Sequence, residues 1–224
     1  MNLRTLHVSL VAMAVVFLTR DASALPLFEI GDAGALPGTA QSAVGVGPLT
    51  SITGVLQTGS DADMFQIFIT GGGTFSATTV GGVSFDTELF LLNAAGFGIY
   101  AQDDVSSSDA PSTLPSGHAL TPAASGEFLL VITRCCVEPA NALGKIFDAS
   151  GNNTAVVGPV GPGGSAAITT YSGASQGSAG AYVITLTGAE FLPAAPLPEP
   201  ASLLLLAGGL GVAVARRWRR TRRG

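Results

Sequence analysis

Three pairs of carboxylates have the residue types and spacing that could bind a metal ion. They are Asp61 and Asp63, Asp86 and Glu88, and Asp103 and Asp104. Two pairs open segments rich in β-branched and aromatic residues and the third closes one, so each is expected at a strand end. Hard oxygen ligands of this kind suit Ca²⁺, and Asp side chains also cap turns, which is the alternative. The candidate Ca²⁺ ligands are Asp61, Asp63, Asp103 and Asp104.

Nucleophilic chemistry has one weak candidate. Ser175 lies in a G-x-S-x-G sequence, the spacing of a hydrolase nucleophile elbow. Such an elbow needs a helix after the serine and a histidine later in the chain, whereas no helical pattern follows and His118 comes earlier. Paired-carboxylate glycoside chemistry would need an acid of raised pKa in a cleft, which the sequence does not indicate. We therefore predict that the chain is not an enzyme and keep a hydrolase as a remote alternative.

The segments that must position these side chains are expected to be strands. Short runs of β-branched and aromatic residues recur between Gly, Ser, Asp and Pro clusters, and no amphipathic helix is evident. The predicted strands are residues 50–56, 63–70, 74–80, 88–92, 98–102, 127–133 and 181–187. Residues 128–132 are apolar on both faces, which indicates a central strand. The pattern predicts an all-β fold, a two-sheet antiparallel sandwich of jelly-roll-like type.

The domain organisation follows from where this pattern begins and stops. Residues 25–48 are weakly patterned and are expected to be a loosely attached lead-in to a β-sandwich domain over residues 49–192. Inside the domain, residues 105–122 are expected to be a long loop. The Gly- and Ala-rich stretch 152–180 is expected to bury little by itself, with a strand at residues 167–171 as the alternative. Residues 193–197 form a proline-containing linker.

The order of motifs in this domain resembles the bacterial pre-peptidase C-terminal domain. The resemblance spans residues 50–190 and rests on segments 61–65, 85–93, 103–104, 126–131 and 182–186, with Gly96 between the second and third. That family implies a small jelly-roll-like sandwich that often accompanies secreted peptidases without being the peptidase. The Gly-rich insertion and the Cys135–Cys136 pair depart from the family pattern.

The N-terminus has the pattern of a signal peptide over residues 1–24. Arg4 supplies the positive charge, residues 8–18 are apolar, and Ala22 and Ala24 form an A-x-A cleavage site. We expect export through the general secretion machinery and cleavage by signal peptidase after Ala24.

The C-terminus, residues 198–224, has the pattern of a membrane-sorting tail. Residues 201–215 are uncharged and apolar, and six of the ten Lys and Arg residues lie in the last nine positions. Fifteen residues rise about 22 Å as a helix, less than the about 30 Å hydrocarbon core, so the flanking arginines must snorkel. The positive-inside rule places the basic cluster in the cytoplasm and the body across the membrane.

These parts together resemble the PEP-CTERM sorting signal of Gram-negative bacteria. The resemblance covers about 25 residues: the tripeptide Pro198, Glu199 and Pro200, the leucine run 203–206 with its following glycines, and Arg216 and Arg217. That family implies an exosortase, a membrane cysteine transpeptidase that recognises the tripeptide and removes the helix. The alternative is a single-span anchor that is never cut.

Export changes how the charge and the cysteines are interpreted. The whole chain has a formal net charge of −5, but residues 25–197 keep only Arg134 and Lys145 against thirteen acids, so the exported body is strongly acidic. It lacks the basic surface that nucleic-acid binding requires. Cys135 and Cys136 would meet an oxidising compartment and have no zinc-site spacing. A vicinal disulfide is favoured over a link between chains or two buried thiols, although neighbours on a strand point to opposite faces.

The sequence thus predicts an exported, non-enzymatic surface or extracellular-matrix protein with a structural or binding body. It would be anchored briefly in the membrane, sorted by an exosortase, and delivered to the cell surface or an exopolysaccharide matrix. The alternative is a carbohydrate- or Ca²⁺-binding lectin-like module. No cofactor other than Ca²⁺ is expected.

Overall fold

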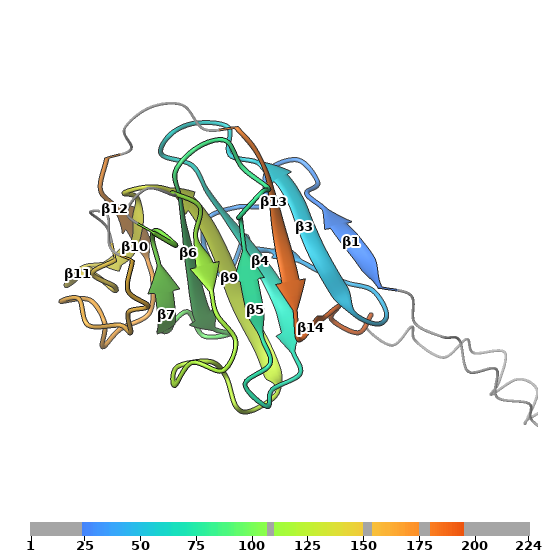
Figure 1. Ribbon diagram of the computed structural model, residues 1–224. Coiled ribbons are helices and arrows are strands. Elements are labelled where there is room, and N and C mark those ends of the chain that lie inside the picture. The colour runs from blue at the N-terminus through green and yellow to red at the C-terminus, as the bar shows by residue number, and fades with distance from the viewer. Residues whose placement is uncertain (1–23, 107–109, 150–153, 175–179, 195–224) are drawn as a thin grey trace, which may run out of the picture.

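The computed structural model describes residues 24–106, 110–149, 154–174 and 180–194, and the regular structure within them is entirely β-strand (Figure 1). The five-stranded sheet contains, in spatial order, β1 (Leu25–Phe28), β3 (Leu49–Val55), β13 (Ala181–Thr187), β5 (Ser76–Thr78) and β8 (Thr113–Leu114). The six-stranded sheet contains β14 (Ala189–Glu190), β4 (Ala62–Ile69), β9 (Gly126–Arg134), β6 (Thr87–Asn93) and β7 (Gly98–Gln102), and β2 (Gln41–Ser42) also pairs with β4.

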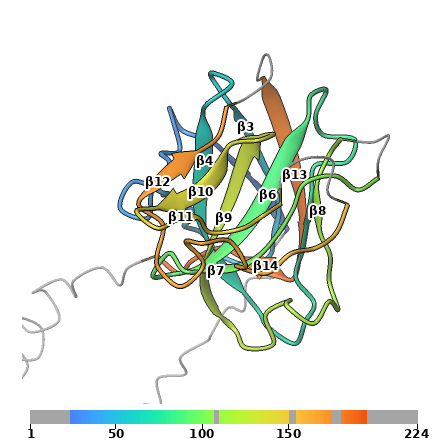
Figure 2. The ribbon, with the colours of Figure 1, turned by 90° about the vertical axis from the view of Figure 1, so that its left-hand side faces the viewer.

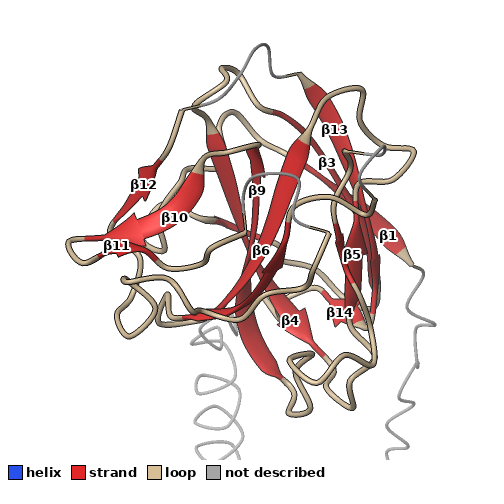
Figure 3. Cartoon of the chain, turned by 60° about the vertical axis from the view of Figure 1, so that its left-hand side comes forward, coloured by secondary structure: helices blue, strands red, loops and turns tan. Residues whose placement is uncertain are grey.

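The two larger sheets share one hydrophobic core (Figure 3). In β13, buried Tyr182, Ile184 and Leu186 alternate with exposed residues, as expected for a strand with one face in the core. They meet Phe65 and Ile67 of β4 and their neighbours from β9, β6 and β7 in the same cluster. The fold is therefore all-β and sandwich-like, with its main core between these two sheets.

A third, small sheet covers the opposite face of the six-stranded sheet (Figure 2). It contains β11 (Gly144–Lys145), β10 (Glu138–Asn141) and β12 (Thr170–Ser172). A second core lies on this outer face, where Met64, Phe90 and Val131 pack with Ile146 and Phe147. The rings of Phe90 and Phe147 lie 5.4 Å apart. Because β6 and β9 are covered on both faces, the central residues of both strands are apolar on both faces, and a carboxylate on the outer face such as Glu88 is buried.

Every strand predicted from the sequence is present, with boundaries that differ by at most a few residues. Residues 128–132 lie in β9 between β4 and β6, which confirms the prediction of a central strand. The prediction of a purely antiparallel sandwich is wrong, because β1 pairs with β3 and β2 pairs with β4 in parallel. Both parallel partners come from residues 25–48, which alternation alone could not assign.

The segments expected to lie outside the predicted strands also contribute to the structure. The expected lead-in supplies β1 and β2, and its Ala33 and Ala43 are buried in the main core. The expected long loop contains β8, with Leu114 buried. The Gly-rich stretch supplies β12, and Ile168 enters the outer core.

The predicted signal peptide, the PEP motif and the apolar segment 201–215 fall outside the described residues. Among the described residues, no helix has the length and hydropathy needed to cross a membrane.

Candidate metal centres

The four predicted Ca²⁺ ligands lie in two separate places. Asp63 is on β4 and points into the main core, where the Tyr182 hydroxyl contacts it. Asp103 directly follows β7, near Asp86 and Cys135 on the outer face. Two strands, β9 and β6, separate β4 from β7, so these carboxylates are about 14 Å apart at about 4.8 Å per strand. The predicted set of four therefore does not form one site, because strand order and strand face both separate its members.

The first centre combines Asp63 with two acids from the expected lead-in. One carboxylate oxygen each of Glu29, Asp32 and Asp63 lie within 4.8 Å of one another. Glu29 follows β1, and its own N–H donates to Thr53 O over 2.9 Å, which continues the parallel pairing with β3. Sequence reasoning missed Glu29 and Asp32 because only the pairing of β1 with β3 brings them beside β4.

Glu29 is held in place by backbone donors. Its Oε1 accepts the Ala33 N–H over 3.0 Å, and its Oε2 accepts the Val55 N–H over 2.7 Å. Gly54 makes this approach possible, since a Cβ there would overlap both the Tyr182 hydroxyl and the Glu29 carboxylate. The backbone thus presents one carboxylate rigidly toward Asp63.

Asp63 is fully buried and only half satisfied. The Tyr182 hydroxyl donates to its Oδ2 over 2.6 Å, while its buried Oδ1 accepts no hydrogen bond from a described residue. Burial raises the pKa of Asp63 to about 7, against the lowering effect of the Tyr182 hydrogen bond, and the charges of Glu29, Asp61 and Asp32 raise it further. A bound cation would relieve both the repulsion and the unsatisfied oxygen.

Asp61 has the geometry of the turn-cap alternative. Its Oδ2 accepts the Gln57 N–H over 2.5 Å, and its Oδ1 accepts the Ala62 N–H over 2.9 Å. Both oxygens therefore stabilise the turn that leads into β4, as Asp side chains commonly do. Asp61 is not one of the three clustered carboxylates. Its charge instead adds to the negative potential at Asp63.

No protein-family model, curated protein or solved structure matches this chain. Its function is therefore argued from the residues and their geometry.

The remaining chemical candidates are placed as follows. Cys135 and Cys136, at the end of β9, are joined by a disulfide bond and lie beside Glu88 on the outer face. His118 Nδ1 accepts the Leu120 N–H over 3.2 Å within a local turn. Ser175 lies outside the described residues. The described geometry therefore offers metal binding as its best-supported chemistry.

The stability of the cation-free protein should depend on pH through Asp63. The unfolded chain releases this proton near pH 3.9 and the folded chain near pH 7, so the folded state holds more protons between these values. The free energy of unfolding should consequently fall as the pH rises through this window. With chelator present, we expect a lower melting temperature at pH 8 than at pH 5, measured by circular dichroism.

The Asp63→Asn variant tests that assignment. Asparagine keeps a carbonyl oxygen for the Tyr182 hydroxyl but cannot ionise, so the difference between pH 5 and pH 8 should shrink. Glu127→Gln, which changes an exposed carboxylate at the far end of β9, should leave the difference as in wild type. An unchanged pH dependence in Asp63→Asn would contradict the prediction.

Proposed function

We propose that this chain is an exported, non-enzymatic surface or extracellular-matrix protein of a Gram-negative bacterium. The observation that carries the proposal is the C-terminal tail, in which the PEP tripeptide, the apolar segment and the basic cluster follow one another in the order of an exosortase signal. The described body ends at Ala194, four residues before Pro198. Even a fully extended chain from Ala194 to Pro198 reaches at most about 14 Å, so the body would stay close to the membrane while the tail is processed.

The proposed route has four steps. The general secretion machinery exports the chain, and signal peptidase removes residues 1–24. Residues 201–215 then hold the protein in the inner membrane, and an exosortase cuts at the PEP motif. The released body enters the cell envelope or an exopolysaccharide matrix as a structural or binding module. The proposal also holds that the strands of the body are connected as in a jelly roll and that the body is related to the pre-peptidase C-terminal domain.

The exported protein should begin at Leu25. The A-x-A site predicts cleavage after Ala24, and Leu25 is the first residue of β1, with its N–H donating to Pro48 O over 3.1 Å. Cleavage there would leave the strand whole. N-terminal sequencing of the exported protein measures this directly, and a mature chain that still contains residues 8–18 would refute it.

A calcium-binding module is the second candidate function, and the Glu29, Asp32 and Asp63 cluster favours it. Three carboxylates with ligand atoms within 4.8 Å, one of them buried with an unsatisfied oxygen, match the oxygen-rich sites that Ca²⁺ occupies. Ca²⁺ would then tie the strand after the signal peptide to the centre of the domain. Calorimetric scans with Ca²⁺ and with chelator test this candidate.

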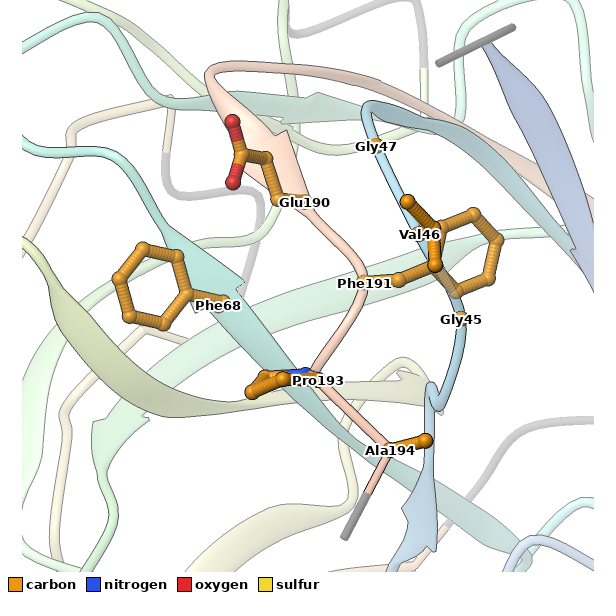
Figure 4. A pocket seen from close by; sticks show the side chains of 8 residues that line it. All are labelled: Gly45, Val46, Gly47, Phe68, Glu190, Phe191, Pro193 and Ala194. Atoms are coloured by element: carbon orange, nitrogen blue, oxygen red, sulfur yellow. The ribbon is translucent and has the colours of Figure 1, made fainter. Parts of the chain in front are cut away.

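A carbohydrate-binding version of this candidate would use a pocket at the C-terminal end of the body. The pocket, of about 540 Å³, is lined by Gly45, Val46, Gly47, Phe68, Glu190, Phe191, Pro193 and Ala194 (Figure 4). The volume of the pocket suits a small ligand. The Glu190 carboxylate, which lies among apolar side chains, could orient a polar group of that ligand. A glycan array with wild type and Phe68→Ala, each with and without Ca²⁺, separates glycan binding from cation binding alone.

A further inference from the structure

A row of oxygen ligands crosses three neighbouring strands on the outer face of the six-stranded sheet. The register pairs Glu88 of β6 with Thr133 of β9. It also pairs Leu89 with Gln102 of β7, so Asp103 comes next to Glu88 on the other side. Directly opposed residues in antiparallel strands have Cβ atoms about 4.5–5.5 Å apart. The pairing therefore places Thr133 and Asp103 on either side of Glu88.

Asp86 joins this row from the same strand edge. It lies two residues before Glu88, and residues two apart share one face of an extended strand. One oxygen each of Asp86 and Asp103 and the Cys135 sulfur lie within 4.8 Å of one another. One Glu88 carboxylate oxygen and the two sulfur atoms of the Cys135–Cys136 disulfide also lie within 4.8 Å of one another. The two groups share Cys135, so the carboxylates surround one end of the disulfide.

Glu88 is the observation that points to a ligand. Its side chain is fully buried, and no described residue donates a hydrogen bond to either carboxylate oxygen. Its cross-strand neighbour Thr133 has a buried hydroxyl that is equally unsatisfied within the described residues. A buried ionised carboxylate without partners is costly, so native proteins pair such groups. Both side chains lack a partner at the same place, which a single bound cation would supply.

The protein charges around Glu88 do not balance. Five carboxylates and two basic side chains interact here, namely Asp86, Glu88, Asp103, Asp104 and Glu138 with Arg134 and Lys145. These two bases are the only ones in residues 25–197. Lys145 is already committed, because its Nζ forms an ion pair with Glu138 Oε1 at 2.6 Å. Negative charge therefore remains in excess, in a part of the domain that is largely buried.

Burial and the neighbouring carboxylates raise the pKa values of Glu88 and Asp86, while Lys145 and Arg134 oppose the rise. Burial raises the pKa of Glu88 well above its ordinary range, and the charges of Asp103 and Glu138 add to the rise. Burial also raises the pKa of Asp86, with the Asp104 charge adding to the rise and Arg134 opposing it. A bound cation would stabilise the ionised forms of Glu88 and Asp86.

A pocket lies at the Asp86 end of the cluster. It has a volume of about 290 Å³ and is lined by Val83, Ser84, Phe85, Asp86, Ala110 and Pro111. Asp86 belongs both to this lining and to the carboxylate cluster, whereas Glu88 and Asp103 are buried.

We propose that Asp86, Glu88 and Asp103, with the Thr133 hydroxyl, bind a Ca²⁺ ion on the outer face of the six-stranded sheet. Carboxylate and hydroxyl oxygens are hard ligands that favour Ca²⁺, whereas sulfur atoms bound to each other offer no thiolate for a soft metal. The site is separate from the Glu29, Asp32 and Asp63 centre, which lies on the other face of the sheet. It does not depend on export or on the tail.

Calcium titration of the full chain in detergent tests this site, with isothermal calorimetry of chelator-treated protein at pH 8. Wild type should bind two Ca²⁺ per chain, and Glu88→Gln should bind one while keeping the shape of the side chain. Asp63→Asn should also bind one, and the double variant none. Asp86→Asn, at the half-buried edge of the cluster, should weaken one site at least tenfold without disturbing the fold. Glu127→Gln should still bind two.

The outcomes separate the two sites. If Glu88→Gln and Asp86→Asn bind Ca²⁺ with wild-type stoichiometry and affinity, the proposal is overturned and Glu88 is simply protonated. The proposal is also overturned if wild type binds one Ca²⁺ ion and the Asp63→Asn variant binds none. If Asp63→Asn changes nothing while Glu88→Gln removes the bound ion, the outer-face site stands and the calcium-module candidate built on Asp63 fails. A melting scan of each variant shows whether it is folded.

Discussion

Replacing Pro198, Glu199 and Pro200 together by alanine should stop release of the protein and leave the precursor in the membrane. A proline ring holds φ near −65° and biases the residue before it toward extended backbone. Glu199 lies between two prolines, so the motif should reach the processing enzyme as an extended segment. Alanine removes both restraints and the carboxylate at once, and we expect a near-complete loss of processing.

Immunoblots of membrane and released fractions measure this effect, together with mass spectrometry for peptides from residues 203–224. Released wild type should contain no such peptide. Pro193→Ala with Pro196→Ala changes the same residue type in the linker and should be released normally. Neutralising Arg216 and Arg217 should also impair release, because the positive-inside rule predicts that these arginines orient the proposed membrane segment. Release of the triple-alanine variant at the wild-type rate would show that no exosortase-type motif operates.

Millimolar Ca²⁺ should raise the melting temperature of the protein by several degrees relative to chelator. A ligand that binds only the folded state adds RT ln(1 + [L]/Kd), about 2.7 kcal/mol at a hundredfold excess over Kd. For a domain of this size, 1 kcal/mol corresponds to about 2–4 °C. The physical source is the repulsion among Glu29, Asp32 and Asp63 and the unsatisfied Asp63 Oδ1, which the ion relieves.

Matched variants assign the effect to its site. Asp63→Asn and Asp32→Asn should each reduce the calcium response, and Asp63→Asn should also stabilise the chelator-treated protein because it removes a buried charge. Glu127→Gln removes one exposed charge elsewhere and should respond to Ca²⁺ as wild type does. The double variant Asp103→Asn with Asp104→Asn should lose only the part of the calcium-dependent rise in melting temperature that comes from the outer-face site. Scans that superimpose with Ca²⁺ and with chelator would leave turn capping, as seen at Asp61, as the role of these acids.

Side-chain alternation was sufficient to locate the main strands. Tyr182, Ile184 and Leu186 in β13, and Phe65 and Ile67 in β4, face the core as their period of two predicts. The continuous apolar run in β9 also predicted its central position. Both patterns can be recognised within a single segment of the sequence. Apolar and polar residues alternate in a strand with one buried face, whereas a strand with two buried faces is apolar on both.

The candidate sites were only partly accessible to this reasoning. The acids at positions 61, 63, 86, 88, 103 and 104 were visible as pairs at strand ends, and Asp86 and Glu88 could be placed on one face. Their grouping was predicted wrongly, since Asp63 and Asp103 lie on opposite faces and three strand spacings apart. The partners of Asp63 were missed because Glu29 and Asp32 lie in a segment without alternation.

The sequence by itself therefore determined an all-β body and the positions of its long strands, because both depend on residues that are neighbours along the chain. The two terminal sorting patterns are equally local and stay predictions. The tertiary structure decided the parallel addition of β1 and β2, the third sheet over the outer face and the burial of Glu88. Those features depend on which strands lie side by side. The strand order depends on how much apolar surface all the segments bury together, so it cannot be predicted from any one segment of the sequence.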